Sequence, residues 1–262
     1  MTPLLETRGL SKTFGGLKAV QNVDLRVDPN RIVSVIGPNG AGKTTFFNCL
    51  SGIYRPDAGA ILLEGHDITG SAPHQVCKRG VARTFQNIRL FPEMTVLENV
   101  LVGQFQHRSI APLPLLARTK HYRNRESECR DEALGFLEFV GLTQYAEAMS
   151  SNLAYGLQRR LEIARALATK PRLLLLDEPA AGMNPQETVE MVQLISRIRD
   201  RGLAILLIEH HMKVVMTISD EILVLDHGIS IAHGAPEKVR NDPQVIKAYL
   251  GEGPADGSND SP

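Results

Sequence analysis

Residues 37–44 read GPNGAGKT and fit the phosphate-binding pattern G-x-x-x-x-G-K-[ST] at every fixed position. The glycines of this pattern let the backbone curl tightly around an anion, because they carry no Cβ atom. Backbone N–H groups of the loop, and the N-terminus of a following helix, attract phosphate oxygens. In this pattern Lys43 reaches the β- and γ-phosphates, and the hydroxyl of Thr44 binds Mg²⁺. We therefore predict that the chain binds a nucleoside triphosphate.

The residues on both sides of this loop support the same interpretation. Residues 32–36 form a short, mostly apolar, β-branched run, which is typical of a buried parallel strand. Residues 45–50 can continue as a helix that ends at Gly52. A glycine-rich turn that lies beside a lysine by chance would need neither a strand before it nor a helix after it. The predicted nucleotide-binding residues of this segment are Gly37, Pro38, Asn39, Gly40, Ala41, Gly42, Lys43, Thr44 and Thr45.

The composition limits the class of protein. The 262 residues can form one large domain or two small ones. Lysine plus arginine equals aspartate plus glutamate, at 29 each, so we expect no nucleic-acid partner. The three cysteines are scattered without CxxC spacing, which favours a reducing cytosol. No apolar run has the length of a transmembrane helix, and the N-terminus lacks the features of a signal peptide. Any membrane connection is therefore expected to pass through a partner protein.

The periodicity of apolar residues predicts an α/β fold. Residues 23–27 alternate between apolar and polar, which is typical of an antiparallel strand with one wet face. Apolar runs at 173–176, 204–208 and 221–225 suit buried parallel strands, and 186–199 carries apolar residues at helical spacing between the first two. This order predicts a parallel sheet core with an added antiparallel β subdomain.

Further elements follow from the same patterns. Short strands are expected at 61–63 and 81–85, and residues 226–228 separate two apolar runs as a hairpin turn. The stretch from about 90 to 155 is poor in β-branched runs, and 132–140 carries its apolar residues on one helical face, so we predict an inserted helical subdomain.

Two polar segments are interpreted as solvated. The mixed-charge run Arg118–Glu132 favours an exposed helix face over a basic docking patch. Residues 253–262 are small, polar and proline-containing, which predicts a flexible tail.

Two carboxylates, Asp177 and Glu178, directly follow the apolar run at 173–176. Ligands of open α/β sheets gather at the carboxyl ends of the parallel strands. We predict that Asp177 supports Mg²⁺ through its water shell and that Glu178 acts on the attacking water as general base.

Polar residues at two further strand ends are expected at the same edge of the sheet. His210 follows the run at 204–208 and can bond a γ-phosphate or orient the catalytic water. Gln86 follows the strand at 81–85 and is a candidate contact of Mg²⁺ or water. Most histidines are structural or merely exposed, and we keep that interpretation for His211, His227 and His233.

Residues 152–160 read NLAYGLQRR and place a glycine turn at the start of a helix, which is again an anion-binding arrangement. With this segment the chain resembles the ATP-binding cassette (ABC) transporter ATPases, whose signature helix starts with LSGGQ some twenty residues before the Asp-Glu strand. The resemblance covers roughly residues 4–250 and includes all major motifs in order. Residues 83–87 (RTFQN), 177–182 (DEPAAG) and 248–252 (AYLGE) narrow it to the branched-chain amino acid importers of the LivG type.

The resemblance implies a P-loop NTPase fold with a RecA-like core, over a domain at 4–252. It also implies ATP and Mg²⁺ as ligands, and stacking of adenine on Phe14. In this family two ATPase subunits, identical or different, sandwich two ATP molecules head to tail. Leu153, Ala154, Tyr155 and Gly156 would then contact the nucleotide of the second subunit. The implied location is the cytoplasmic face of the inner membrane, held by permease subunits that receive solute from an external binding protein.

Two other functions remain open at this point. One is a soluble, non-transport ABC ATPase, although such proteins usually carry coiled-coil insertions or two cassettes. The other is a low-turnover nucleotide-binding regulatory module, because Leu157 stands where the signature usually has glutamine, and His211 where aspartate commonly follows the switch histidine. The positioned carboxylate Glu178 and His210 argue against a pure sensor. The transported solute follows only from the subgroup resemblance.

Leu157 leads to a prediction about turnover. Leucine cannot donate a hydrogen bond, and losing one preorganised donor to the transition state slows a reaction by about 10²–10³. In a heterodimer this signature would face the partner's ATP, so the two ATP sites are expected to be unequal. Leu157→Gln should raise turnover at the partner's site, measured as steady-state ATP hydrolysis. An unchanged rate would contradict this argument.

Overall fold

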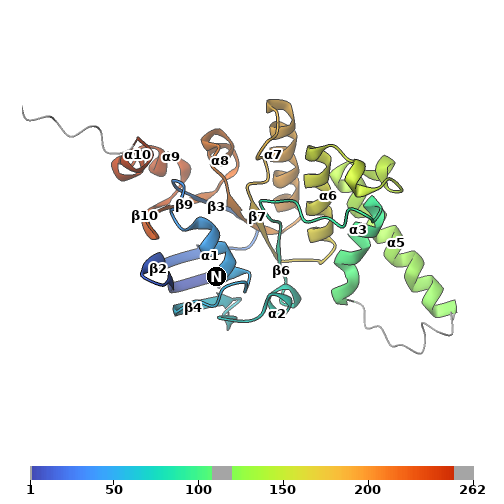
Figure 1. The fold of residues 1–262 in the computed structure, drawn as a ribbon, viewed down its shortest axis with the longest axis horizontal. Coiled ribbons are helices and arrows are strands. Elements are labelled where there is room, and N and C mark those ends of the chain that lie inside the picture. The colour runs from blue at the N-terminus through green and yellow to red at the C-terminus, as the bar shows by residue number, and fades with distance from the viewer. Residues whose placement is uncertain (1, 108–119, 251–262) are drawn as a thin grey trace, which may run out of the picture.

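The computed structural model of the chain describes residues 2–107 and 120–250, which form two β-sheets with helices packed against them (Figure 1). The first sheet is antiparallel, in the order β2-β1-β4-β5, and consists of β1 (Leu5–Phe14), β2 (Leu17–Val27), β4 (Ala58–Leu63) and β5 (His66–Asp67). The second sheet, in the order β10-β9-β3-β8-β7-β6, consists of β3 (Ile32–Ile36), β6 (Val81–Arg83), β7 (Leu173–Asp177), β8 (Ala204–Ile208), β9 (Glu221–Asp226) and β10 (Ile229–Gly234).

The helices of the described ranges lie around these sheets. They are α1 (Lys43–Leu50), α2 (Pro73–Lys78), α3 (Val96–Gly103), α5 (Lys120–Val140), α6 (Tyr155–Leu167), α7 (Pro185–Asp200), α8 (Met212–Ile218), α9 (Pro236–Arg240) and α10 (Pro243–Leu250), with short 3-10 turns at Gln104–His107, Thr143–Tyr145 and Ser150–Asn152.

The six-stranded sheet contains the predicted parallel core. Strands β9, β3, β8, β7 and β6 run parallel, and only β10 pairs antiparallel with β9 across the hairpin turn predicted at 226–228. Every residue of β3, β7 and β8 is buried. Alternate residues of β7 belong to different hydrophobic clusters, Leu173 and Leu175 to one and Leu174 and Leu176 to the other. Because both faces are covered, the sequence of these strands is continuously apolar instead of alternating.

Helix α1 joins the two sheets. Its Phe46 and Phe47 are fully buried, in a cluster that includes Leu25 of the antiparallel sheet and Val35 of the parallel one. Since α1 starts directly after the phosphate loop, this packing fixes the direction in which the start of the helix points. The apolar residues of α1 therefore position the loop as well as filling the core.

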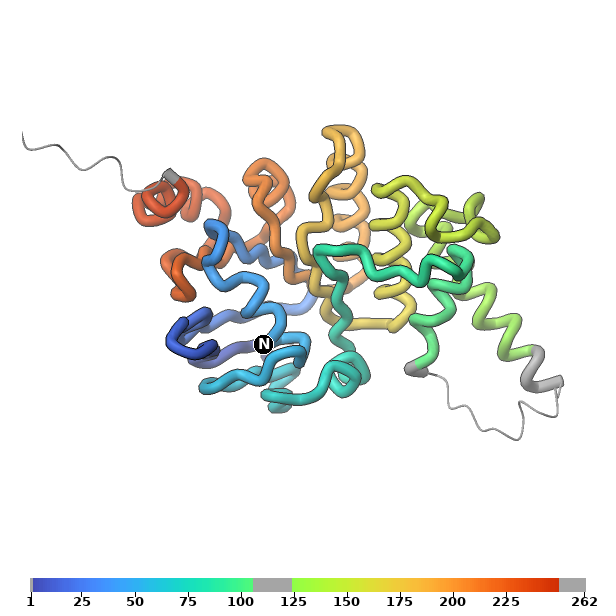
Figure 2. The backbone as a smooth tube through the Cα atoms, in the orientation of Figure 1, coloured from blue at the N-terminus to red at the C-terminus, as the bar shows by residue number. Residues whose placement is uncertain are grey.

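Helices α3, α5 and α6 form a separate group, on the side of the parallel sheet away from the antiparallel sheet (Figure 2). The predicted apolar face at 132–140 is buried in this group, with Ala133, Leu137 and Val140 almost inaccessible to solvent. Residues 124–131 are exposed apart from Cys129, as expected for a solvated helix face.

Strands β1 and β6 differ from what the sequence predicted. The sequence did not reveal β1, because irregular pairing between Thr7 and Thr13 disrupts its period-two pattern. The strand expected at 81–85 ends at Arg83, where the chain turns toward helix α6. Within the described ranges, no helix combines the length and apolar composition needed to cross a bilayer. Arg118 of the charged run and the tail at 253–262 lie outside the described residues.

Candidate functional site

A cavity of about 720 Å³ opens at the start of α1. Residues 39–45 of the predicted phosphate-binding segment line it, together with Phe14, Gln86 and Glu178. Gly37, Pro38, Asp177 and His210 lie outside this lining. One cavity thus collects groups from β1, from the loop after β3, and from the ends of β6 and β7.

Close backbone approaches determine the shape of the phosphate loop (residues 37–44). A Cβ atom on Gly37 would lie 2.0 Å from the carbonyl oxygen of Leu225, and one on Gly42 would lie 2.2 Å from that of Ala19. Gly42 also has a φ of 98° and directly precedes α1, so no side chain caps the first turn of that helix. The open helix start and the bare backbone suit a polyphosphate anion.

The ammonium group of Lys43 lies inside this loop. Its Nζ donates to the carbonyl oxygens of Gly37 at 2.7 Å and Pro38 at 2.8 Å. Burial lowers the pKa of Lys43, while the nearby carboxylates of Glu178 and Asp177 oppose that shift. An anion between the loop amides and Nζ would favour the charged form of this lysine.

Asp177, the last residue of β7, is buried and forms an ion pair with Arg83, with 2.9 Å between Oδ2 and Nη2. Burial raises the pKa of Asp177, and the hydrogen bond from Arg83 lowers it in part. Arg83 also donates to Asn48 at 2.7 Å and to Ser51 at 2.9 Å, so it links β6 and β7 with α1. Sequence reasoning did not identify Arg83, because its partners are far away in the chain.

The predicted residues Gln86, Glu178 and His210 converge. Nε2 of Gln86 donates to Oε2 of Glu178 at 2.9 Å, and Nδ1 of His210 lies 3.8 Å from Oε1 of the same carboxylate. Glu178 has a left-handed backbone with a φ of 49°. Such a conformation costs a residue with a Cβ atom about 1–3 kcal/mol and is found preferentially at functional sites. The side chain of Glu178 reaches the cavity from this strained position.

The signature turn (residues 153–156) lies at the start of α6, outside the lining of the nucleotide cavity. Ala154 precedes the helix, Leu153 and Gly156 are buried, and Tyr155 is about half exposed. Leu157 packs against the hydrophobic cluster that contains the buried residues of α5 and α6, and the side-chain amide of Gln158 donates to the carbonyl oxygen of Leu153 at 2.9 Å.

Two aromatic residues, Phe14 and His227, line the cavity. Phe14 lines it, is 42% exposed, meets the ring of Tyr54 edge to face at 5.2 Å and has Nζ of Lys12 at 5.3 Å from its ring centre. His227, which the sequence indicated as structural or merely exposed, also lines the cavity, from the hairpin after β9. Its position follows from the parallel pairing of β9 with β3, which brings the ends of both strands to the phosphate loop.

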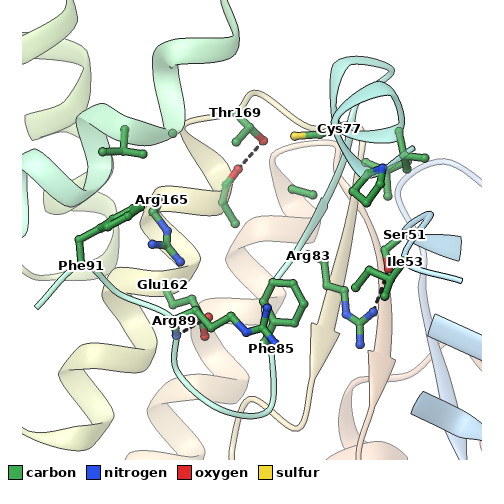
Figure 3. Close-up of a pocket in the computed structure, with 17 residues that line it drawn as sticks. Ser51, Ile53, Cys77, Arg83, Phe85, Arg89, Phe91, Glu162, Arg165 and Thr169 are labelled. Atoms are coloured by element: carbon green, nitrogen blue, oxygen red, sulfur yellow. Dashed lines mark hydrogen bonds between the residues drawn. The ribbon is translucent and has the colours of Figure 1, made fainter. Parts of the chain in front are cut away.

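A second cavity of about 430 Å³ lies between α2, β6, α3 and α6, and we call it the side groove (Figure 3). Its apolar wall includes Ile53, Phe85 and Phe91, of which Ile53 and Phe91 are more than 40% exposed. Its charged wall consists of Arg83, Arg89, Arg165 and Glu162. Burial lowers the pKa of Arg165 and raises that of Glu162.

A family model described as ABC transporter matches residues 20–181, which is more than half of the chain. The chain belongs to the ABC transporter family. A second family model, described as branched-chain amino acid ATP-binding cassette transporter, matches residues 231–255. The family and the fold class predicted from the sequence are therefore confirmed, and the chain is an ATP-binding, ATP-hydrolysing subunit of this family.

Individual relatives agree. The chain is 52% identical to the high-affinity branched-chain amino acid transport ATP-binding protein BraF of Pseudomonas aeruginosa, over 95% of this chain and 98% of that protein. It is 53% identical to LivG of Escherichia coli, again over 95% of this chain and 98% of that protein. A solved ATP-binding cassette of an ABC transporter in its ADP conformation superposes with a TM-score of 0.84 at 33% identity, covering 96% of this chain and all of that one.

The position of Lys43 leads to a binding prediction. A hydrogen bond to a charged group contributes about 1.5–3 kcal/mol, so Lys43→Ala should weaken ATP binding roughly 10- to 100-fold. Isothermal titration calorimetry with ATP measures this change. Lys238→Ala, an exposed lysine of α9, is the matched control and should bind ATP like the parent protein. Equal affinities in all three proteins would contradict the assignment of the phosphate loop.

Proposed function

We propose that this chain is the ATPase subunit that powers an importer of branched-chain or related amino acids. The observation that carries the proposal is the convergence of the phosphate loop, Gln86 and Glu178 on one cavity. The sequence identity of 52% to BraF and 53% to LivG, and the family-model match at residues 231–255, support branched-chain amino acids as the solute. They favour a transport subunit over a soluble ATPase or a regulatory module.

In this proposal the substrate ATP lies with its phosphates on the amides of residues 39–45 and on Lys43. Bound Mg²⁺ would neutralise charge on the β- and γ-phosphates. Thr44 and Gln86 are the candidates to hold the ion directly. Asp177, whose Oδ2 is occupied by Arg83, would support its water shell through Oδ1. Phe14, which lines the cavity and is partly exposed, is the candidate to stack on adenine.

The carboxylate of Glu178 would accept the proton of the attacking water, and His210 would orient that water or bond the γ-phosphate. Nε2 of Gln86 donates to Oε2 of Glu178, so Oε1 of Gln86 is the atom that would contact Mg²⁺ and Oε1 of Glu178 is the atom that would face the attacking water.

We infer that the complete ATP site needs a second ATPase subunit, the same or different. The signature turn at 153–156 lies outside the chain's own cavity, which supports contact with a nucleotide bound elsewhere. The wider proposal includes a cassette domain at 4–252 with a helical subdomain at about 90–155. It also includes location at the cytoplasmic face of the inner membrane through permease subunits that are served by an external solute-binding protein.

The side groove is the surface that best fits a permease segment. It is concave and exposes Ile53 and Phe91, and aromatic side chains such as that of Phe91 are enriched at protein interfaces. It also borders the loop of Gln86, since Phe85 and Arg89 line it. A permease docked there would contact the segment that reaches the catalytic carboxylate.

Glu178→Gln tests the proposed activity. The amide cannot accept a proton, so ATP hydrolysis should fall by about 10²–10⁴ while ATP binding persists. The ATP-bound variant should then accumulate as a stable dimer, which size-exclusion chromatography detects. Glu237→Gln, an exposed glutamate of α9, should hydrolyse ATP like the parent. Hydrolysis by the Glu178 variant at the parental rate would show that the base is wrongly assigned.

The docking surface has its own test. Ile53→Glu places a charge in the side groove and should abolish co-purification with the permease, because desolvating an unpaired carboxylate is costly. Ile246→Glu, on α10 with a similar exposure of 46%, is the matched control and should leave the complex intact. Retention of the permease by both variants would exclude the groove as the docking site.

A further inference from the structure

Arg159 of helix α6 is almost completely buried, with 2% of its side chain exposed, and all of its donors are engaged. An arginine side chain carries five N–H donors. Nε and Nη2 donate to the hydroxyl oxygen of Tyr155 at 3.2 and 2.9 Å, and Nη1 donates to Oε2 of Glu162 at 3.3 Å. The two remaining contacts go to the backbone carbonyl oxygens of Phe85 and Gln86.

These contacts join two segments that are far apart in the sequence. Phe85 and Gln86 belong to the glutamine loop (residues 84–89), which follows β6. The side chain of Gln86 is bonded to Glu178, while its backbone is bonded to Arg159. Tyr155 belongs to the signature turn. A single guanidinium group thus holds the backbone of the glutamine loop against the start of helix α6.

The same cluster reaches the side groove. Oε1 of Glu162 accepts a hydrogen bond from the backbone N–H of Arg89 at 3.3 Å, and both residues line the groove (Figure 3). Glu162 is therefore bonded to the far end of the glutamine loop and, through Oε2, to Arg159. The loop is held at both ends by one ion pair of helix α6.

A role confined to stabilising α6 would not need these contacts. Glu162 and Tyr155 lie three and four positions from Arg159, so the intrahelical bonds alone would satisfy that role. Buried ion pairs contribute little net stability compared with apolar side chains of similar size. The bonds to two consecutive carbonyl groups outside the helix are the feature that requires arginine, because a planar guanidinium can serve both at once.

We propose that Arg159 is a positioning residue that makes the glutamine loop and the signature helix move as one body, and thereby sets the reach of Gln86 to Glu178. The expected effect of Arg159 on ATP hydrolysis rests on the proposed function, whereas its expected effect on the position of the glutamine loop does not. Loss of the clamp frees the glutamine loop without removing any group that grips the nucleotide. The rate of ATP hydrolysis then falls, while the affinity for ATP is unchanged.

The test compares Arg159→Lys with Arg160→Lys in the full chain. Lysine keeps the charge but cannot span both carbonyl groups and Tyr155. Arg160 is the next residue of the same helix, and its partners are Glu190 and the carbonyl oxygen of Val140, none of which belongs to the glutamine loop. Hydrogen–deuterium exchange of residues 84–89 should accelerate about tenfold or more in the Arg159 variant only. Equal exchange in both variants and the parent would overturn the proposal.

Steady-state kinetics provide the second readout. Arg159→Lys should lower kcat roughly tenfold and change KM for ATP by less than about twofold, whereas Arg160→Lys should change neither beyond twofold. A raised KM at unchanged kcat would overturn the proposal, because it would mean that Arg159 serves binding. If the parent itself does not hydrolyse ATP, the proposed function fails, and the exchange measurement still decides the role of Arg159.

A second variant covers the case in which Arg159→Lys does not fold. The double substitution Arg159→Gln with Glu162→Gln removes both charges of this ion pair together, so neither member of the pair is left without the other. It should show the same faster exchange at 84–89 and the same split between kcat and KM. A folded double variant with parental exchange and parental kcat would equally contradict the proposal.

Discussion

Contacts from distant strands hold the phosphate loop so closely that it has room for glycine alone at two positions. The carbonyl groups of Ala19 and Leu225 press on it from β2 and from the end of β9. The N–H of Gly228 in the following hairpin donates to the carbonyl of Ala41 at 3.1 Å, and the N–H of Gln21 in β2 donates to that of Gly228 at 2.7 Å. The anion-binding shape of the loop thus depends on the antiparallel sheet and on the hairpin as much as on its own residues.

Buried charges arrange the rest of the site around this loop. Arg83 pairs with Asp177 and ties the ends of β6 and β7 to α1, and Arg159 pairs with Glu162 and ties the glutamine loop to α6. Burial by itself raises the pKa of the carboxyl groups of Asp177 and Glu162, and the facing arginines oppose the shift. Each pair therefore sets complementary buried side chains against one another, one pair at the ends of β6 and β7 and the other on α6.

Much of the fold could be predicted because its signals are local. The strands β3, β7 and β8 are continuous apolar runs, and the buried face of α5 repeats at helical spacing. Strand β1 escaped prediction because its bulges break the alternation of buried and exposed residues. The strand at 81–85 stopped early because the carbonyl groups of Phe85 and Gln86 turn toward Arg159 instead of continuing the sheet.

The phosphate loop, the Asp177-Glu178 pair and the family of the chain can be recognised from the amino-acid order alone, since each motif is contiguous and its chemistry depends on neighbouring residues. The direct hydrogen bond from Gln86 to Glu178, the clamp by Arg159 and the place of His227 beside the cavity came only from the folded chain. The two hydrogen bonds join residues that are 92 and 73 positions apart, and His227 lines the same cavity as Lys43, which lies about 180 positions earlier in the chain. No local pattern encodes such pairs, because sheet order and helix packing bring them together.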